Sequence, residues 1–368
     1  MDSRALTIVL YITLLLIVPF FINIASKNNN KSQRYIYYSI ILIIPSFIAA
    51  FKGITGTDSQ MYEAVYNNLP VQRSGEIEAG YMWLNNTFNK FMPYEFFLLI
   101  IYFIMLYLLV ISIDKYRTYI NVYIASFILF SNFYFLAFNI MRQCLAVSIC
   151  VYGIISYIDD RKLIKMLLIV LIACTIHVTS IICVLVLLLS YLYKSKSRYR
   201  SLFLIITLII GLLLLFNRGI MSTFITNLTN STYYSDYLTK AEGNNIGILK
   251  FIFQLSPVII ILCVYYKYFT QAKENIYFLL VLMIVGYVIT AIGSIADTQA
   301  NRGGLYFTIL NTIVLSFCAN NNLKLGNIII KKDITTGVIF VYFLAMFIYS
   351  SIIRNYGEVI PYMPFYNL

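Results

Sequence analysis

Uncharged apolar runs about as long as a lipid bilayer is thick recur along this chain, and few folds can accommodate them. Residues 5–26 and 96–113 are two such runs, and neither contains a charged side chain. An α-helix needs about 20 apolar residues to cross the hydrocarbon core. Because backbone polar groups find no water in lipid, each run predicts a helix, and its continuity differs from the alternating pattern of a membrane β-barrel.

Twelve apolar runs, most of them uncharged, predict an all-α polytopic membrane protein that forms one domain over residues 1–368. Charged residues make up 11% of the chain, whereas a soluble domain typically has about 25%. The first run is too long for a signal-peptide core and no A-x-A-like site follows it, so we predict a helix there as well. The predicted spans are 5–24, 35–51, 94–113, 119–137, 139–158, 163–176, 178–193, 201–217, 247–268, 275–295, 303–319 and 334–352.

The distribution of charge predicts which helix ends face the cytoplasm. With the N-terminus outside, the loops on one side hold 17 of the 27 basic residues and five of the 15 acidic residues. The other side then holds 10 of each, so the whole net charge of +12 belongs to one face. Basic residues favour cytoplasmic loops, so this charge reports topology and no nucleic-acid partner is needed to explain it. Loops 52–93 and 218–246 are then extracytoplasmic.

Several kinds of enzyme are not indicated, because their motifs are missing from the sequence. It has no P-loop, HExxH, GxGxxG or GxSxG pattern, so neither ATP hydrolysis nor serine-hydrolase chemistry is predicted. One histidine cannot supply a metal site built on two, and none of the six cysteines forms a CxxC pair. The Asp159–Asp160 pair, within DDRK, is predicted to form a turn and a helix cap.

Arg142 is the one charged residue in SNFYFLAFNIMRQCLAVSICVYGIISYI, residues 131–158. A charge inside a membrane-spanning segment is costly and usually faces a wet cavity or a bound anion. Asn139 and Gln143 lie beside it, so we predict a polar pocket at this depth. The alternative is an arginine whose side chain reaches the lipid headgroups.

Other polar residues are predicted at the same outer level, on segments far apart in the sequence: Lys52, Asp58, His177, Asp297, Arg302 and Arg354. Taken singly, Arg354 is explained as an interfacial anchor, His177 as a hydrogen-bonded structural histidine, and Asp58 as the N-cap of a helix beginning near Gln60. His177 lies where spans six and seven nearly fuse, and one kinked or re-entrant element is the alternative prediction there.

Taken together, these residues suit an anionic, lipid-linked substrate. Arginine binds phosphate bidentately, and two or three arginines at a membrane surface match a pyrophosphate. They would stabilise the charge that develops as a pyrophosphate leaves, without a metal. A nearby carboxylate or imidazole would accept the proton of an attacking hydroxyl.

Short motifs follow one another over residues 52–365: GTDSQMYEAVY, EAGYMWLNNTFNKF, FNIMRQCLAVSICVYGI, CTIHVTSIICVLVLLL, NRGGLYF and VIPYMPFY. In content and order they resemble the GTD-x-x-x-Y, EPGY, IRQ-x-x-A, FH-x-S-A, R-x-x-x-YF and late PY elements of EpsG-like proteins and related Wzy polysaccharide polymerases. Ala79 departs from the pattern, since the family often has proline there; this concerns a turn more than the chemistry.

The resemblance implies a multi-helix fold with an outward-facing cavity of the GT-C kind, in the bacterial plasma membrane. Such polymerases transfer a growing glycan from undecaprenyl pyrophosphate to the non-reducing end of another lipid-linked repeat unit, on the outer face and without metal or cofactor. The implied partners are the lipid-linked donor and acceptor, the bilayer, and a chain-length regulator and flippase of the same pathway.

The resemblance also implies roles for individual residues. Arg142 and Arg302 are expected to bind the donor pyrophosphate, His177 or Asp58 to act as the acceptor base, and Arg354 to contact a further phosphate. The remaining residues expected to bind substrate are Lys52, Tyr62, Glu78, Tyr81, Gln143, Asp297 and Tyr306.

Other functions are also compatible with the sequence. A lipid-linked oligosaccharide flippase would use many helices and a basic cavity, but its polar residues should extend through the helix centres, and here they gather at the outer ends. An O-antigen-type ligase or a membrane acyltransferase is a third possibility. An acyltransferase drawing on cytoplasmic acyl-CoA should have its histidine on that side, whereas His177 is predicted outside.

Overall fold

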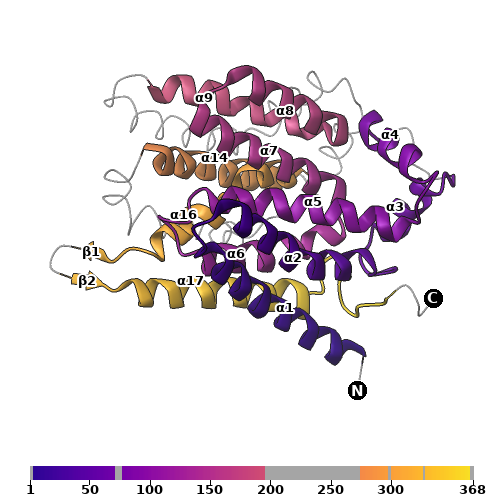
Figure 1. Cartoon of the computed structure of the whole chain (residues 1–368), viewed down its shortest axis with the longest axis horizontal. Coiled ribbons are helices and arrows are strands. Elements are labelled where there is room, and N and C mark those ends of the chain that lie inside the picture. Colours follow the sequence, from indigo (N-terminus) through magenta and orange to yellow (C-terminus); the bar gives the residue numbers. More distant parts are fainter. Residues whose placement is uncertain (1–2, 71–76, 195–273, 297–299, 326–327, 365–368) are drawn as a thin grey trace. The chain divides into compact units, whose positions relative to one another are not determined.

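The computed structural model describes residues 3–70, 77–194, 274–296, 300–325 and 328–364, most of which are helical (Figure 1). Contacts divide the chain into two compact units. The first comprises Met1–Ile181 and Leu315–Leu368, and the second comprises Ile182–Val314. The two ends of the sequence therefore belong to one unit.

The first unit is a helical bundle. Its helices are α1 (Ser3–Ser26), α2 (Lys31–Ala50), α3 (Ser59–Tyr66), α4 (Ala79–Phe88), α5 (Tyr94–Asp114), α6 (Val122–Leu129), α7 (Met141–Asp160), α8 (Leu163–Ile176) and α17 (Lys332–Phe347). Helical turns of other pitch follow α6 (Phe130–Tyr134 and Leu136–Phe138) and α17 (Ile348–Ile353). Two short antiparallel strands, β1 (Leu323–Leu325) and β2 (Ile328–Ile330), precede α17.

Helix α7 forms the centre of the first unit. Of the apolar 18-residue core of this helix, 83% is buried, compared with 17% for the corresponding core of Lys332–Ile353. Helix α7 packs against α5 and α8, and α5 packs against α2. The small residues Cys144, Ala146 and Ser148 are fully buried in α7, and small side chains let membrane helices approach closely. Arg142 is therefore carried by the most enclosed of these helices.

The second unit is described in part. A 3-10 segment (Val178–Val184) leads from the first unit into α9 (Leu185–Lys194), and α14 (Glu274–Ala296) packs against it. The 3-10 turn Ala300–Gly304 and α15 (Leu305–Thr308) also pack on α14. Helix α16 (Asn311–Cys318) then returns the chain to the first unit.

The predicted fold class is confirmed at the level of an all-α membrane protein. In the part of the chain that the structure describes, α1, α2, α5, α7 and Lys332–Ile353 are long and apolar enough to cross a membrane. Shorter apolar helices cover most of the other predicted spans. Spans 201–217 and 247–268 and loop 218–246 lie outside the described residues, so twelve spans and the outward cavity stay predictions.

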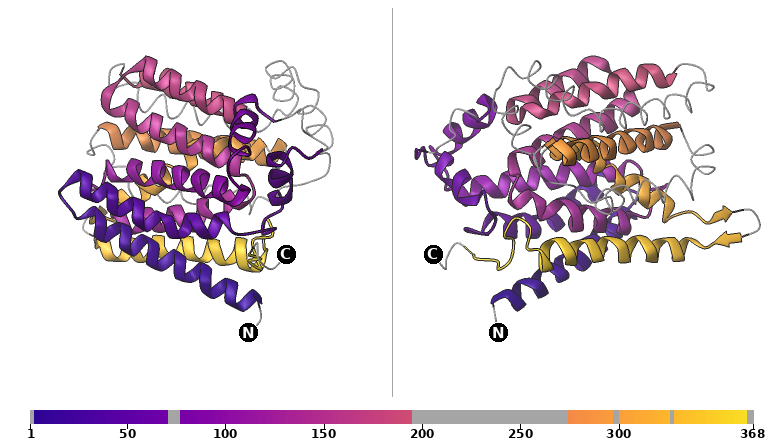
Figure 2. Two further views of the ribbon diagram at one scale, coloured as in Figure 1. Left: turned by 45° about the vertical axis from the view of Figure 1, so that its right-hand side comes forward. Right: turned by 180° about the vertical axis from the view of Figure 1, so that it is seen from behind.

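Contacts gather the predicted cytoplasmic loops of the first unit at one end. Lys115 Nζ lies 3.1 Å from Asp159 Oδ2, which joins the ends of α5 and α7. Asp159 and Asp160 are the last two residues of α7 and not the predicted turn; the chain turns at Arg161 and Lys162, where the backbone nitrogen of Lys162 donates to Asp160 Oδ1 at 3.1 Å. Figures 1 and 2 show α3, α4 and the C-terminal segment at the opposite end from β1 and β2.

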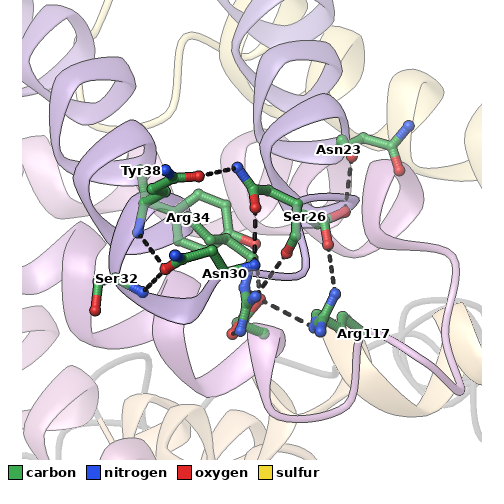
Figure 3. A network of polar contacts seen from close by, with 10 residues as sticks. Asn23, Ser26, Asn30, Ser32, Arg34, Tyr38 and Arg117 are labelled. Atoms are coloured by element: carbon green, nitrogen blue, oxygen red, sulfur yellow. Dashed lines mark hydrogen bonds and ion pairs between the residues drawn. The ribbon is translucent and has the colours of Figure 1, made fainter.

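A buried polar network ties this basic end together (Figure 3). Arg34 of α2 donates from Nε and Nη2 to the two oxygens of Asp114, at 2.8 and 3.0 Å, and Tyr38 adds a third donor at 2.8 Å. Arg117 donates to the carbonyl of Ser26 at 2.8 Å. The end of α1, the start of α2 and the end of α5 are thus held at one point.

Replacing Asp114 with asparagine is expected to lower the free energy of unfolding by about 3–5 kcal/mol, because it leaves the buried Arg34 without its counter-ion. The side chains of Arg34 and Asp114 are 6% and 3% exposed. The measurement is the thermal unfolding midpoint of the purified protein in detergent. Asp160→Asn is the matched control, since Asp160 pairs with Lys165 at an exposed site and should change the midpoint little. Equal midpoints for the two variants would contradict the prediction.

Candidate functional site

Arg142 lies in the first turn of α7, at the end of the first unit opposite the basic network. Asn139 and Ile140 connect the turns after α6 to this helix start. A positive side chain near a helix N-terminus is disfavoured by the helix dipole, so Arg142 requires a nearby anion.

Glu78 supplies that anion from the N-cap of α4. Its Oε2 accepts a hydrogen bond from Nη1 of Arg142 at 2.6 Å. Its Oε1 lies 2.8 Å from Nδ1 of His177 and accepts from the backbone nitrogen of Val178 at 3.1 Å. One carboxylate therefore joins the start of α4, the start of α7 and the end of α8. We call Tyr62, Glu78, Tyr81, Arg142 and His177 the Glu78 cluster.

His177 occupies the break between α8 and the following 3-10 segment. Helix α8 ends at Ile176, and the backbone of His177 is extended, with φ −153° and ψ 113°. Separate helical elements therefore lie on either side of His177, as the prediction of two spans has it. An ionised Glu78 can only accept hydrogen bonds, so the proton of a neutral His177 lies on Nδ1. No described residue is hydrogen-bonded to Nε2, which leaves that nitrogen as a potential proton acceptor.

Two tyrosines enclose the guanidinium group of Arg142. Its Cζ lies 5.9 Å from the ring centre of Tyr62 and 5.7 Å from that of Tyr81. Burial raises the pKa of Tyr62 to about 12, against the opposing charge of Arg142, so this hydroxyl stays protonated at neutral pH. Nε of Arg142 is buried and has no hydrogen-bond partner in the described part of the chain. An unsatisfied buried donor is costly, so the cluster keeps hydrogen-bonding capacity for an added acceptor.

Glu78 is ionised at neutral pH. Burial alone would raise its pKa, but the hydrogen bond and charge of His177 and the charge of Arg142 outweigh burial and lower it. A carboxyl whose pKa is lower in the folded than in the unfolded protein stabilises the fold above its unfolded pKa. That stabilisation is lost as the pH falls through the folded pKa.

We therefore expect the wild type to lose stability relative to Glu78→Gln on acidification, because glutamine does not titrate. The gap in thermal midpoint should be full near neutral pH and should shrink below the ordinary pKa of a glutamate, about 4.3. Midpoints of both proteins in detergent over an acidic pH series measure this. A gap that is independent of pH would show that the charge of Glu78 does not stabilise the fold.

Gly80 lets α4 approach α8 closely enough for Glu78 to reach His177. A Cβ at this position would lie 2.6 Å from the backbone oxygen of Thr175, closer than a Cβ can come. Ala79, the predicted departure from the family pattern, is the first residue of α4 and is exposed. Proline is well tolerated at that position, so the departure leaves the local backbone unchanged.

Replacing Gly80 with alanine should reduce the glycan polymerisation that the family resemblance implies at least about tenfold, since misplacement by about 1 Å can cost a factor of about 100. The added methyl group would push α4 off Thr175 and separate Glu78 from His177. Ala79→Pro, one residue earlier, is the control and should retain activity. Glycan length produced at matched protein levels is the measurement, and full activity of Gly80→Ala would contradict the role given to this close approach.

The GTD loop, residues 52–58, is assembled with the C-terminal segment beside the cluster. Asn139 Oδ1 accepts from the backbone nitrogen of Thr57 at 2.7 Å. The nitrogens of Gly56 and Thr57 donate to the carbonyls of Glu358 and Gly357 at 3.1 and 3.2 Å. Gly56 and Gly357 have φ of +98° and +76°, which other residues rarely adopt. Segments about 300 residues apart are therefore in direct contact, which agrees with the prediction that they lie at one level.

Pro361 and Tyr362, the late PY motif, join the same loop. The nitrogen of Met363 donates to Oγ1 of Thr55 at 2.7 Å, and the hydroxyl of Tyr362 donates to the carbonyl of Ile48 at 3.0 Å. The motif therefore has a structural role in holding the GTD loop.

Lys52 and Asp58, at the two ends of the loop, lie in different surroundings. Lys52 is 3% exposed, its Nζ donates to the carbonyl of Thr55 at 2.7 Å, and it also contacts Oγ of Ser59. Burial lowers the pKa of Lys52 to about 7. Asp58 precedes α3, as predicted for a helix beginning near Gln60, but its side chain makes no capping hydrogen bond. Substrate contacts for both residues stay predictions.

The remaining predicted residues are not joined to the cluster by the contacts described above. Arg354 is exposed and its Nε donates to the hydroxyl of Tyr349 at 3.1 Å. Arg302 and the buried Tyr306 belong to the second unit, so their approach to Arg142 stays a prediction. Gln143 is 5% exposed, next to Arg142. Asp297 lies outside the described residues.

The central position of Glu78 was not predicted, although the residue itself was. Its sequence signal is the EAGY motif, in which a carboxylate precedes a helix start and a glycine. Nothing local indicates that its partners lie 64 and 99 residues away.

Comparison with known proteins identifies the family. No curated protein and no solved structure matches the chain significantly. The model of the EpsG family matches residues 35–363, which include every motif described above apart from the last residues of VIPYMPFY. The suspected resemblance is thereby confirmed, and this chain belongs to the EpsG family.

Proposed function

We propose that this chain is a polysaccharide polymerase that joins lipid-linked oligosaccharide repeat units on the outer face of the bacterial plasma membrane. Membership of the EpsG family supports a polymerase-type membrane protein. The proposed architecture has twelve helices around an outward-facing cavity of the GT-C kind. This cavity admits the donor and the acceptor, both linked to undecaprenyl pyrophosphate. A chain-length regulator and a flippase are its proposed partners.

The reaction transfers the donor glycan to an acceptor hydroxyl. The hydroxyl oxygen forms a bond to the anomeric carbon of the donor, and the bond from that carbon to the pyrophosphate oxygen breaks. The electron pair leaves with the lipid pyrophosphate, whose charge Arg142 stabilises. The proton of the hydroxyl passes to Nε2 of His177. The chemistry uses neither a nucleotide sugar nor a metal, and Arg302 and Arg354 are further proposed contacts to phosphate.

The observation that carries the proposal is the placement of Arg142 and His177 on one carboxylate. Nη1 of Arg142 lies 2.6 Å and Nδ1 of His177 lies 2.8 Å from the two oxygens of Glu78. A guanidinium group suited to phosphate and an imidazole suited to proton transfer are therefore side by side. Of the two candidate bases, His177 or Asp58, this favours His177.

Reconstitution tests the proposal. The purified protein in vesicles should lengthen glycans when supplied with polyprenyl pyrophosphate-linked repeat units alone. A flippase would move the substrate across the bilayer without lengthening it, and a ligase would need an acceptor of another kind. Failure to lengthen glycans, by protein that unfolds cooperatively and is therefore folded, would overturn the proposal.

A further inference from the structure

Glu78 carries one negative charge and contacts two groups, Arg142 and His177. Phosphate binding requires Arg142 to be free of this carboxylate, whereas proton acceptance by His177 requires the carboxylate to stay in place. Its Oε2 neutralises Arg142, whose guanidinium must be available if it is to bind phosphate. Its Oε1 is held by His177 and by the backbone nitrogen of Val178. The Arg142 contact depends on a single hydrogen bond, whereas the His177 side has two. Release of Oε2 from Arg142 would therefore leave the carboxylate anchored through Oε1.

We propose that Glu78 is a positioning residue that acts as the counter-ion of Arg142 until a pyrophosphate displaces it, and then serves His177 alone. This inference rests on the function proposed above. In the free protein the carboxylate of Glu78 occupies the position on Arg142 that the phosphate of the substrate takes, and it leaves that position when the substrate binds.

The exchange is favoured by the chemistry of both anions. A pyrophosphate carries more charge than a carboxylate and can accept two parallel hydrogen bonds from the guanidinium fork. The side chains of Arg142, Glu78 and His177 are 17%, 14% and 21% exposed, so the exchange takes place at a site that is only partly open to water. Charges interact more strongly in such surroundings than in bulk water.

Once released from Arg142, Glu78 is left with the imidazole. A carboxylate hydrogen-bonded to Nδ1 holds the tautomer in which Nε2 accepts a proton, and it stabilises the imidazolium that forms. Donor binding at Arg142 would therefore leave the whole negative charge of Glu78 to the imidazole side of the cluster. His177 would then accept the proton only when the donor, with its pyrophosphate leaving group, is bound.

Titratable and charged groups around the Glu78 cluster come from the helices that form it. Helix α4 contributes Glu78 and Tyr81, and α7 contributes Arg142. Cys174 of α8 lies close to Cys150 of α7. Tyr62 of α3 lies against Arg142, and Asp58 acts electrostatically on Tyr62. Among these, Glu78 alone is an anion in contact with the ring.

Two measurements on the full-length protein in detergent test the inference, with inorganic pyrophosphate as the probe. The first is its affinity by calorimetry. Glu78→Gln should bind pyrophosphate roughly tenfold more tightly than the wild type, because the competing charge is gone. Glu63→Gln removes a nearby carboxylate that does not contact Arg142 and should bind as the wild type does. Arg142→Ala should lose the binding.

The second measurement is the nitrogen NMR signal of the histidine ring. The chain has one histidine, so the signal reports on His177 alone. The wild type should show the proton on Nδ1, and pyrophosphate should shift this signal more in the wild type than in Glu78→Gln. Any direct effect of the added anion is common to both proteins, so the difference isolates Glu78.

The outcomes separate this inference from the proposed function. Equal or weaker pyrophosphate binding by Glu78→Gln, equal shifts in the two proteins, or no binding by any of them would overturn the exchange. Glycan lengthening by the wild type together with such a result would leave the polymerase proposal standing. Tighter binding by Glu78→Gln without any lengthening by the wild type would retain the exchange and reject the polymerase.

Discussion

Replacing Arg142 with alanine is expected to reduce chain elongation about 100- to 1,000-fold, the usual cost of removing a group that stabilises a leaving charge. The substitution removes the guanidinium from between Tyr62 and Tyr81 and leaves Glu78 without one of its three donors. Cells complemented with this variant should make single repeat units only. The measurement is glycan length by gel electrophoresis, with the amount of protein in the membrane matched to the wild type.

Two further variants sharpen this test. Arg142→Lys keeps the charge but loses the planar fork, so its elongation should lie between wild type and Arg142→Ala. Lys162→Ala removes an exposed positive charge at the opposite end of α7 and should elongate normally. Wild-type chain length from Arg142→Ala would remove Arg142 from the mechanism, whatever the effect of the other two.

Replacing His177 with alanine should reduce elongation about 100- to 10,000-fold if its imidazole accepts the proton of the acceptor hydroxyl. Donor binding should change much less, because Arg142 remains. A histidine-directed reagent offers a second measurement: since the chain has one histidine, inactivation reports on His177, and lipid-linked donor should protect it.

Full activity of His177→Ala would reassign the base to Asp58, the other candidate. Asp58→Asn is therefore the companion variant. It should elongate at near the wild-type rate, since Asp58 lies beside Thr57 and contacts neither Arg142 nor His177 in the described contacts. Loss of activity in Asp58→Asn alone would reverse the assignment.

The helices could be predicted from the sequence because lipid leaves the backbone few alternatives. Apolar runs near 20 residues must be helical, so α1, α2, α5, α7 and α17 follow from length and composition. The break at His177 was one of two predicted alternatives. The separate turns after α6 were not predicted, because apolar periodicity alone does not distinguish one helical pitch from another.

The sequence predicted which residues belong to the site better than it predicted the contacts between them. Arg142 and His177 stand out because charge and imidazole are rare in such segments. The role of Glu78 depends on a close approach of α4 to α8 at Gly80, which packing between distant segments decides. Lys52 shows the converse: it was predicted to bind substrate, but its side chain is buried in its own loop, where the carbonyl of Thr55 accepts a hydrogen bond from its Nζ.

The contacts between the GTD loop and residues 357–363 have a consequence for biosynthesis. The loop is made early and inserted soon after α2, whereas its hydrogen-bond partners are synthesised after α17. A nascent chain therefore holds this loop without its partners until residues 357–363 have been made. Loss of residues beyond Asn355 would leave the backbone donors of Gly56 and Thr57 without their carbonyl partners and expose this loop to proteolysis. Assembly of the GTD loop thus waits for the synthesis of residues 357–363.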